Sequence, residues 1–176
     1  MEQALPVGLG DIDASFRVYM GNIPNYRDIP QIHGIRALQD GEVKLIGDAC
    51  GNGWRKVFNV YAKLVFALKL ELHNELQGYG SWQQWRDECL LRADSNSVLL
   101  FSKPESGTIK AHQIHIVMGK AWAKSCGLEG KVEWLNKDFA IHPELPLIVC
   151  PYFDYRQLSN QKILFLSELI AKYSTL

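Results

Sequence analysis

The longest periodic run of apolar residues lies between residues 54 and 76. The segment WRKVFNVYAKLVFALKLELHNEL places apolar side chains three or four residues apart, at Val57, Tyr61, Leu64, Val65, Leu68 and Leu72. This spacing gathers them on one face of a helix. The pattern therefore predicts a long core helix.

Two further segments have the same helical period. After Ser81, which is a suitable N-cap, Trp82, Trp85 and Cys89 are three to four residues apart. After Ser159 or Asn160, the segment QKILFLSELIAKYS carries an apolar face made of Ile163, Leu166, Leu169, Ile170 and Tyr173. We expect a short second helix and a helix near the end of the chain.

Short apolar runs predict strands. FRVYMGN (16–22) is rich in β-branched and aromatic residues and stops at glycine, whereas SVLLFS (97–102) and LPLIVCPY (145–152) are continuously apolar, as in strands buried on both faces. The segment 109–125 fits either a strand that ends at Gly119 with a helix from Lys120, or one helix that begins near Thr108. We favour the strand followed by the helix.

Strands that alternate with helices favour an α/β fold, here a three-layer sandwich with a mainly parallel central sheet, in one domain over residues 1–176. Ligands of such sheets bind at the carboxyl ends of the strands. That edge would gather the loop that begins at Gly21, the loop after Ser102 and the segment CPYFDYRQLSN (150–160).

Composition limits the partners and the cellular compartment that the sequence favours. Lys and Arg number 19, as do Asp and Glu, so only a local basic patch would attract nucleic acid. The four cysteines, Cys50, Cys89, Cys126 and Cys150, have no CxxC spacing, which favours reduced thiols. No segment is apolar over membrane-spanning length, and no signal peptide pattern opens the sequence. We therefore expect a cytoplasmic protein without a membrane partner.

Five segments taken in order resemble the motifs of the uracil-DNA glycosylase superfamily. GNIPNYRDIPQIHGIRA (21–37) is similar to the family's GQDPYHGPGQAHGLCF, and WRKVFNVYAKL (54–64) to its SLxNIYKEL helix. NSVLLFS (96–102), HIVMGKAWA (115–123) and IVCPYFDYRQL (148–158) are similar to GVLLLN, LLWGKPAQ and the strand that leads into HPSPLS. The resemblance implies the family's fold and a site for a flipped nucleobase.

The same resemblance implies altered catalysis. Ile23 stands where the family places an acidic residue or asparagine, and Tyr152 or Phe153, followed by Asp154, where it places a histidine. Phe101 or Ser102 replaces the asparagine that reads the base, and about Ala37 falls where the stacking aromatic belongs. The pocket candidates are Asn22, Ile23, Asn25, Tyr26, His33, Ser102, Tyr152 and Asp154.

Several candidates have two interpretations. Asn22 or Asn25 would position water if the loop register shifts, but turn asparagines beside proline are the simpler interpretation. His33 is either a site residue or, by preference, a histidine at the core edge bonded to backbone. His112 and His115 would form a metal pair with Asp154 only if they shared a face, so we expect neither metal nor cofactor.

Basic and aromatic side chains are the remaining candidates. Lysines and an arginine in or beside the strand-end loops would form a phosphate-binding patch, namely Lys103, Lys110, Lys120, Lys124 and Arg156. Tryptophans would stack on exposed bases, and the set is Trp54, Trp82, Trp85, Trp122 and Trp134. The helical spacing of Trp82 and Trp85 favours a place in the core.

Three functions stay open from the sequence. The favoured hypothesis is a catalytically degenerate binding protein for a nucleobase, a nucleotide or single-stranded nucleic acid. The first alternative is an enzyme, either a glycosylase that acts through Asn22 or Asn25, or a hydrolase with Cys50 activated at the start of a helix. The second alternative is an interaction module whose pocket is closed by Ile23 and Phe153.

Overall fold

The computed structural model describes residues 5–68 and 78–173. Within them an eight-stranded sheet has the order β3-β1-β4-β2-β5-β8-β7-β6. The strands are β1 (Gly8–Gly10), β2 (Phe16–Tyr19), β3 (Ile35–Arg36), β4 (Ser97–Leu100), β5 (Ile114–Met118), β6 (Glu133–Trp134), β7 (Ala140–Ile141) and β8 (Leu147–Cys150). The helices are α1 (Glu42–Cys50), α2 (Asn52–Ala67), α3 (Trp82–Glu88), α4 (Lys120–Ser125) and α5 (Asn160–Tyr173).

The centre of the sheet is parallel. Strands β4, β2, β5 and β8 pair side by side in the same direction, whereas β1 on β4, and β7 on both β6 and β8, are antiparallel. The chain runs from β2 to β4 on one side and later from β5 to β8 on the other. The order thus reverses between β2 and β5, where ligands of open α/β sheets bind.

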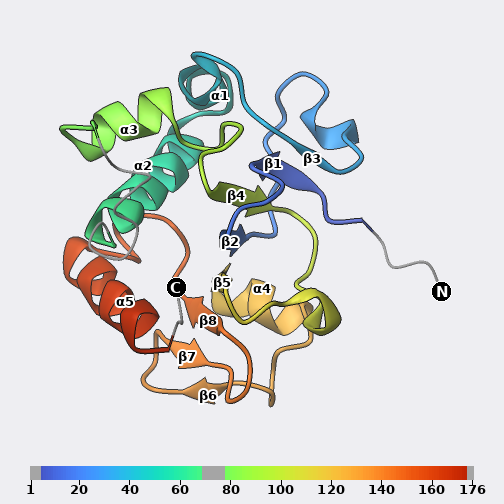
Figure 1. The fold of residues 1–176 in the computed structure, drawn as a ribbon, viewed down its shortest axis with the longest axis vertical. Helices are drawn as coiled ribbons and strands as arrows, with labels where there is room; N and C mark the ends of the chain where they lie inside the picture. The colour runs from blue at the N-terminus through green and yellow to red at the C-terminus, as the bar shows by residue number, and fades with distance from the viewer. Residues whose placement is uncertain (1–4, 69–77, 174–176) are drawn as a thin grey trace.

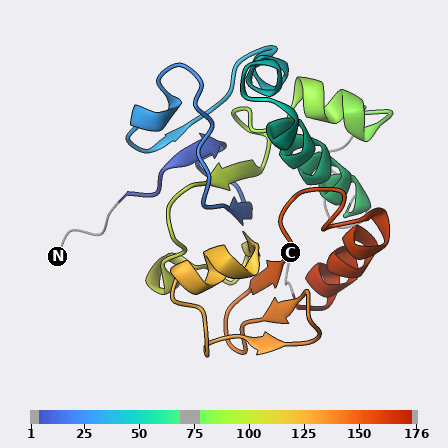
Figure 2. The same cartoon turned by 180° about the vertical axis from the view of Figure 1, so that it is seen from behind.

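Alternating residues divide the core between the two faces of the sheet. On β2, Phe16 and Val18 point to one apolar cluster, and Tyr19 points to the other. Helices α1, α2, α3 and α5 cover the first face, and α4 lies on the second (Figures 1 and 2). The expected layered α/β architecture with a mainly parallel sheet is confirmed, and its antiparallel margins were not predicted.

The predicted helices and strands form. Ser81 caps α3, where its Oγ accepts a hydrogen bond of 3.1 Å from the backbone N–H of Gln84. The ambiguous segment 109–125 is β5 followed by α4, as favoured. The long helix is confirmed through Ala67, with Leu68 as its C-cap, and residues 69–76 of the predicted helix lie outside the described residues.

The short strands β3, β6 and β7 were not predicted, and neither were α1 and β1. Helix α1 lies between Gly41 and Gly51, which both have positive φ, and therefore is a helix separate from α2. Strand β1 consists of the residues Gly-Leu-Gly, a sequence without a strand signal. A Cβ at Gly8 would overlap the carbonyl oxygen of Leu99, so this backbone approach requires glycine.

In the described part of the chain, no helix is both long enough and apolar enough to cross a membrane.

Candidate functional site

The loops after β2, β5 and β8 meet at the carboxyl edge of the sheet. Asn22, just beyond β2, donates a hydrogen bond of 3.2 Å from Nδ2 to the Tyr152 hydroxyl, which follows β8. A Cβ at Gly21 would lie 2.8 Å from the ring of Trp122 in α4. The geometry therefore brings together two of the segments that the sequence placed at one edge, the loop from Gly21 and the segment 150–160, and adds α4 to them.

Asp154 is the most strongly bonded side chain of this edge. It is 8% exposed, and its carboxylate accepts hydrogen bonds from the Arg156 backbone N–H and guanidinium, each at 2.9 Å. The Nζ of Lys56 lies 3.5 Å from Oδ2 of the same carboxylate. These contacts, led by the Arg156 hydrogen bond, lower the pKa of Asp154 to about 2. The carboxylate is therefore ionised, and its charge is balanced by Arg156 and Lys56. Arg156 in turn is engaged in this ion pair.

Ile23 does not close a pocket at this edge. Its side chain is 45% exposed, while Phe153 is fully buried in the core on the first face of the sheet. Tyr26 is also buried, with the Arg27 guanidinium 5.1 Å from its ring centroid. Of the two side chains expected to close a pocket, Phe153 is therefore buried and Ile23 is not, and the interaction-module alternative stays a prediction.

The structure also places Cys50, Asn25 and His33. Cys50 is the last residue of α1 and precedes Gly51, the N-cap of α2. The Cys50 thiol donates a hydrogen bond of 3.6 Å to the backbone carbonyl oxygen of Asn25. His33 is exposed, which contradicts the preferred interpretation as a core-edge histidine.

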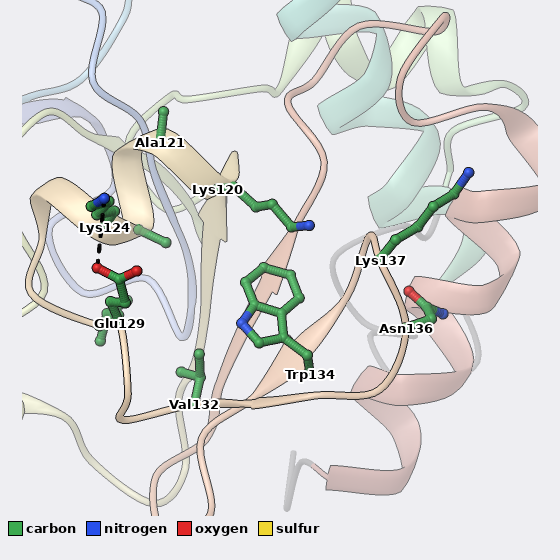
Figure 3. A pocket seen from close by; sticks show the side chains of 10 residues that line it. Lys120, Ala121, Lys124, Glu129, Val132, Trp134, Asn136 and Lys137 are labelled. Carbon is green, nitrogen blue, oxygen red and sulfur yellow. Dashed lines mark ion pairs between the residues drawn. The ribbon is translucent and has the colours of Figure 1, made fainter.

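A groove of about 530 Å³ opens beside this edge, between α4 and the β6–β7 hairpin (Figure 3). Lys120, the first residue of α4, places its Nζ 4.6 Å from the centroid of the Trp134 ring. Trp134 is 44% exposed, although tryptophan is usually well buried. The groove thus offers an aromatic ring with a cation beside it.

Two more lysines line the groove. Lys124 forms a 3.8 Å ion pair with Glu129, whereas Lys137 lies on the turn between β6 and β7. Asn136 builds that turn, since its side-chain oxygen accepts from the backbone N–H groups of Asp138 and Phe139 at 2.8 and 2.9 Å. An aromatic surface next to lysines is suited to stack a base and attract its phosphates.

The predicted phosphate patch is divided by the fold. Lys120 and Lys124 line the groove, but Lys103 and Lys110 line a different cavity. Arg156 is paired with Asp154. Ser102, at the end of β4, accepts a 3.2 Å hydrogen bond from the Val7 backbone N–H. Lys103, Lys120 and Arg156 therefore do not line one common cavity.

The histidines that were weighed as metal ligands are likewise separated. His115 is buried on the second face of the sheet, where its Nδ1 is 2.7 Å from the Tyr19 hydroxyl, and His112 is exposed. Among the described residues, no group of three or more His, Cys, Asp or Glu side chains is placed to hold a metal ion.

Sequence reasoning missed Lys137 and Asn136 and named Trp134 only as one of five tryptophans. The turn-forming segment LNKDF between two short strands was the available signal for the hairpin that places them. Trp85, expected in the core, is 1% exposed.

A family model of unknown function, DUF6942, matches residues 7–171. The chain belongs to the DUF6942 family. No curated protein and no solved structure matches it significantly. The family match spans both the strand-end cluster and the Lys120–Trp134 groove, so each is part of the DUF6942 domain rather than an appended segment.

Proposed function

We propose that this DUF6942 protein binds single-stranded nucleic acid through the Lys120–Trp134 groove, without efficient glycosylase chemistry. The observation that carries the proposal is the half-exposed Trp134 ring beside Lys120, with Lys124 and Lys137 on the same groove. A base would stack on the indole, and the lysines would neutralise neighbouring phosphates.

The order of the elements supports a divergent member of the uracil-DNA glycosylase superfamily. The segments that resemble its motifs form β2 with its loop, α2, β4, β5 with α4, and β8 with its loop. The parallel strands among them bring the corresponding loops to one edge. We propose the relationship on this correspondence of motif order and structural order.

The residues at the catalytic positions support binding rather than base excision. Ile23 has no polar group with which to place water or stabilise a cationic sugar. The carboxylate of Asp154 is held by Arg156 and Lys56, and Asn22 donates to Tyr152. The protein is therefore expected to hold a base without cleaving its glycosidic bond.

The test is fluorescence anisotropy of a labelled single-stranded oligonucleotide, with and without uracil, at two salt concentrations. We expect salt-sensitive binding that weakens about tenfold in Trp134→Ala, because stacking on an aromatic contributes about 1–3 kcal/mol per base. Lys120→Ala should weaken binding less and reduce its salt dependence. A parallel assay for abasic product should show no base release.

The chain offers a matched control. Lys172 lies 5.3 Å from the Tyr173 ring centroid at the end of α5, and the residues that line the groove do not include this pair. Lys172→Ala and Tyr173→Ala should leave oligonucleotide binding unchanged. Absence of binding at low salt, or equal losses in both pairs of variants, would overturn the proposed interface.

A further inference from the structure

A second cavity, of about 250 Å³, lies on the second face of the sheet, apart from the groove. Its floor is formed by Arg17 and Tyr19 of β2 and by His115 of β5, where Arg17 and His115 are register partners. The connection between β4 and β5 contributes Lys103 and Lys110 to the wall. The function proposed above does not use this cavity.

Arg17 is a buried cation without a carboxylate partner among the described residues. It is 9% exposed, and its Nη1 donates to the carbonyl oxygens of Ala14 at 3.0 Å and Ile12 at 3.3 Å. No described carboxylate lies within 4.0 Å of its nitrogens. A buried charge is costly unless it is paired. The guanidinium also hydrogen-bonds the Tyr19 side chain. These neutral partners use part of its five N–H donors and leave its charge unpaired.

The remaining floor is polar but neutral. The Tyr19 hydroxyl lies 2.7 Å from His115 Nδ1, and His115 Nε2 lies 3.0 Å from Gln113 Oε1. Burial, assisted by the positive charge of Arg17, lowers the pKa of His115 to about 3, and burial raises the pKa of Tyr19 to about 12. Near neutral pH neither group supplies a charge to pair with Arg17.

The charge balance of the cavity identifies the kind of ligand. Arg17, Lys103 and Lys110 are cationic, Glu105 is the anionic residue of the lining, and the other lining side chains are uncharged at neutral pH. Three positive charges less one leave two positive charges. A single carboxylate would neutralise half of this excess, whereas a dianion would neutralise it.

We propose that this cavity binds a phosphate dianion, either inorganic phosphate or the phosphoryl group of a monoester, with Arg17 as its buried anchor. The planar guanidinium matches two phosphate oxygens, and flexible lysines supply further positive charge at the rim. A water molecule takes about 30 Å³ of liquid volume, so the cavity admits a phosphate-sized group with some of its hydration.

Isothermal titration of the full chain with inorganic phosphate at neutral pH tests the site. We expect saturable binding that Lys103→Ala with Lys110→Ala weakens by about tenfold or more, since each exposed lysine adds a charge-assisted contact. Arg17→Gln should abolish binding. Because that buried substitution can also impair folding, the exposed double variant, checked by far-UV circular dichroism, is the decisive one.

Each control arm has a defined outcome. Sulfate, also a dianion, should compete with phosphate, and acetate at matched ionic strength should not. Lys172→Ala should bind phosphate as the unmodified chain does. The proposal fails if phosphate gives no saturable heat, if the folded double variant binds equally well, or if acetate binds as tightly. The double variant should retain oligonucleotide binding, which separates failure here from failure of the groove.

Discussion

Asp154 shows how one side chain orders the loop that follows β8. Its carboxylate accepts three hydrogen bonds from Arg156 and one from Lys56, and its backbone carbonyl accepts from the N–H groups of Gln157 and Leu158 at 2.8 and 2.7 Å. These bonds form a turn between β8 and α5. Asp154, a pocket candidate in the sequence, therefore also holds the loop after β8 in place.

Replacing Asp154 with asparagine should lower the free energy of unfolding by about 1 kcal/mol at neutral pH, because the charged contact of the buried carboxylate with the exposed Arg156 is lost while the shape is kept. The pKa of Asp154 falls from 3.8 to about 2 on folding. Its contribution is therefore present above pH 4 and is lost as the pH falls toward 2.

Urea unfolding at neutral pH and near pH 2 measures this effect. The difference between the unmodified chain and Asp154→Asn should shrink at the acidic pH. The exposed Asp13→Asn is the control, with little effect at either pH. A difference that is independent of pH would contradict the assigned role of the charge.

At the scale of elements, sequence patterns succeeded where one element carries its own signal. The apolar stripe of α2 and the Ser81 cap of α3 are local, and both were predicted. Strand β1 was not predictable, because glycine is required at position 8 only by the close approach of the β4 backbone, which no local sequence pattern shows. The contact between Lys120 of α4 and Trp134 of β6 depends on how the β6–β7 hairpin folds back beside α4. A hydrophobic period does not predict such a contact between separate elements.

Tyr61 connects α2 to the sheet and gives a prediction at this scale. Its fully buried hydroxyl accepts from the Val98 backbone N–H at 3.0 Å and lies 3.0 Å from the carbonyl oxygen of the same residue. Tyr61→Phe should lower the free energy of unfolding by about 1–3 kcal/mol, since buried backbone groups of β4 lose their partner.

Urea unfolding monitored by circular dichroism compares this variant with Tyr155→Phe, whose side chain is 56% exposed and should tolerate the change. Equal stability of the two variants would show that the hydroxyl of Tyr61 contributes little to the attachment of α2.

For the whole molecule, balanced charge means that attraction to nucleic acid is local. The formal net charge is zero, so no long-range field draws a polyanion to the surface, and the lysines of the groove provide the attraction. The buried cation of the second cavity is likewise a local feature of a neutral chain.

This balance gives a quantitative prediction for the salt dependence of oligonucleotide binding. With phosphate contacts from Lys120, Lys124 and Lys137, the plot of log affinity against log salt should have a slope of about −2, at roughly 0.7 per contact on single strands. Lys137→Ala should make the slope shallower by about 0.7. A slope near zero, measured by anisotropy over a salt series, would remove the lysines from the interface.

The contact between Gly21 and Trp122 has a consequence for the history of the family. A side chain at position 21 would meet the indole ring at 2.8 Å, and the ring is fixed by α4 on the second face of the sheet. A larger residue at position 21 is therefore tolerated only where residue 122 is smaller than tryptophan. Across DUF6942 sequences, a larger residue at position 21 should coincide with a smaller one at position 122, as paired substitutions.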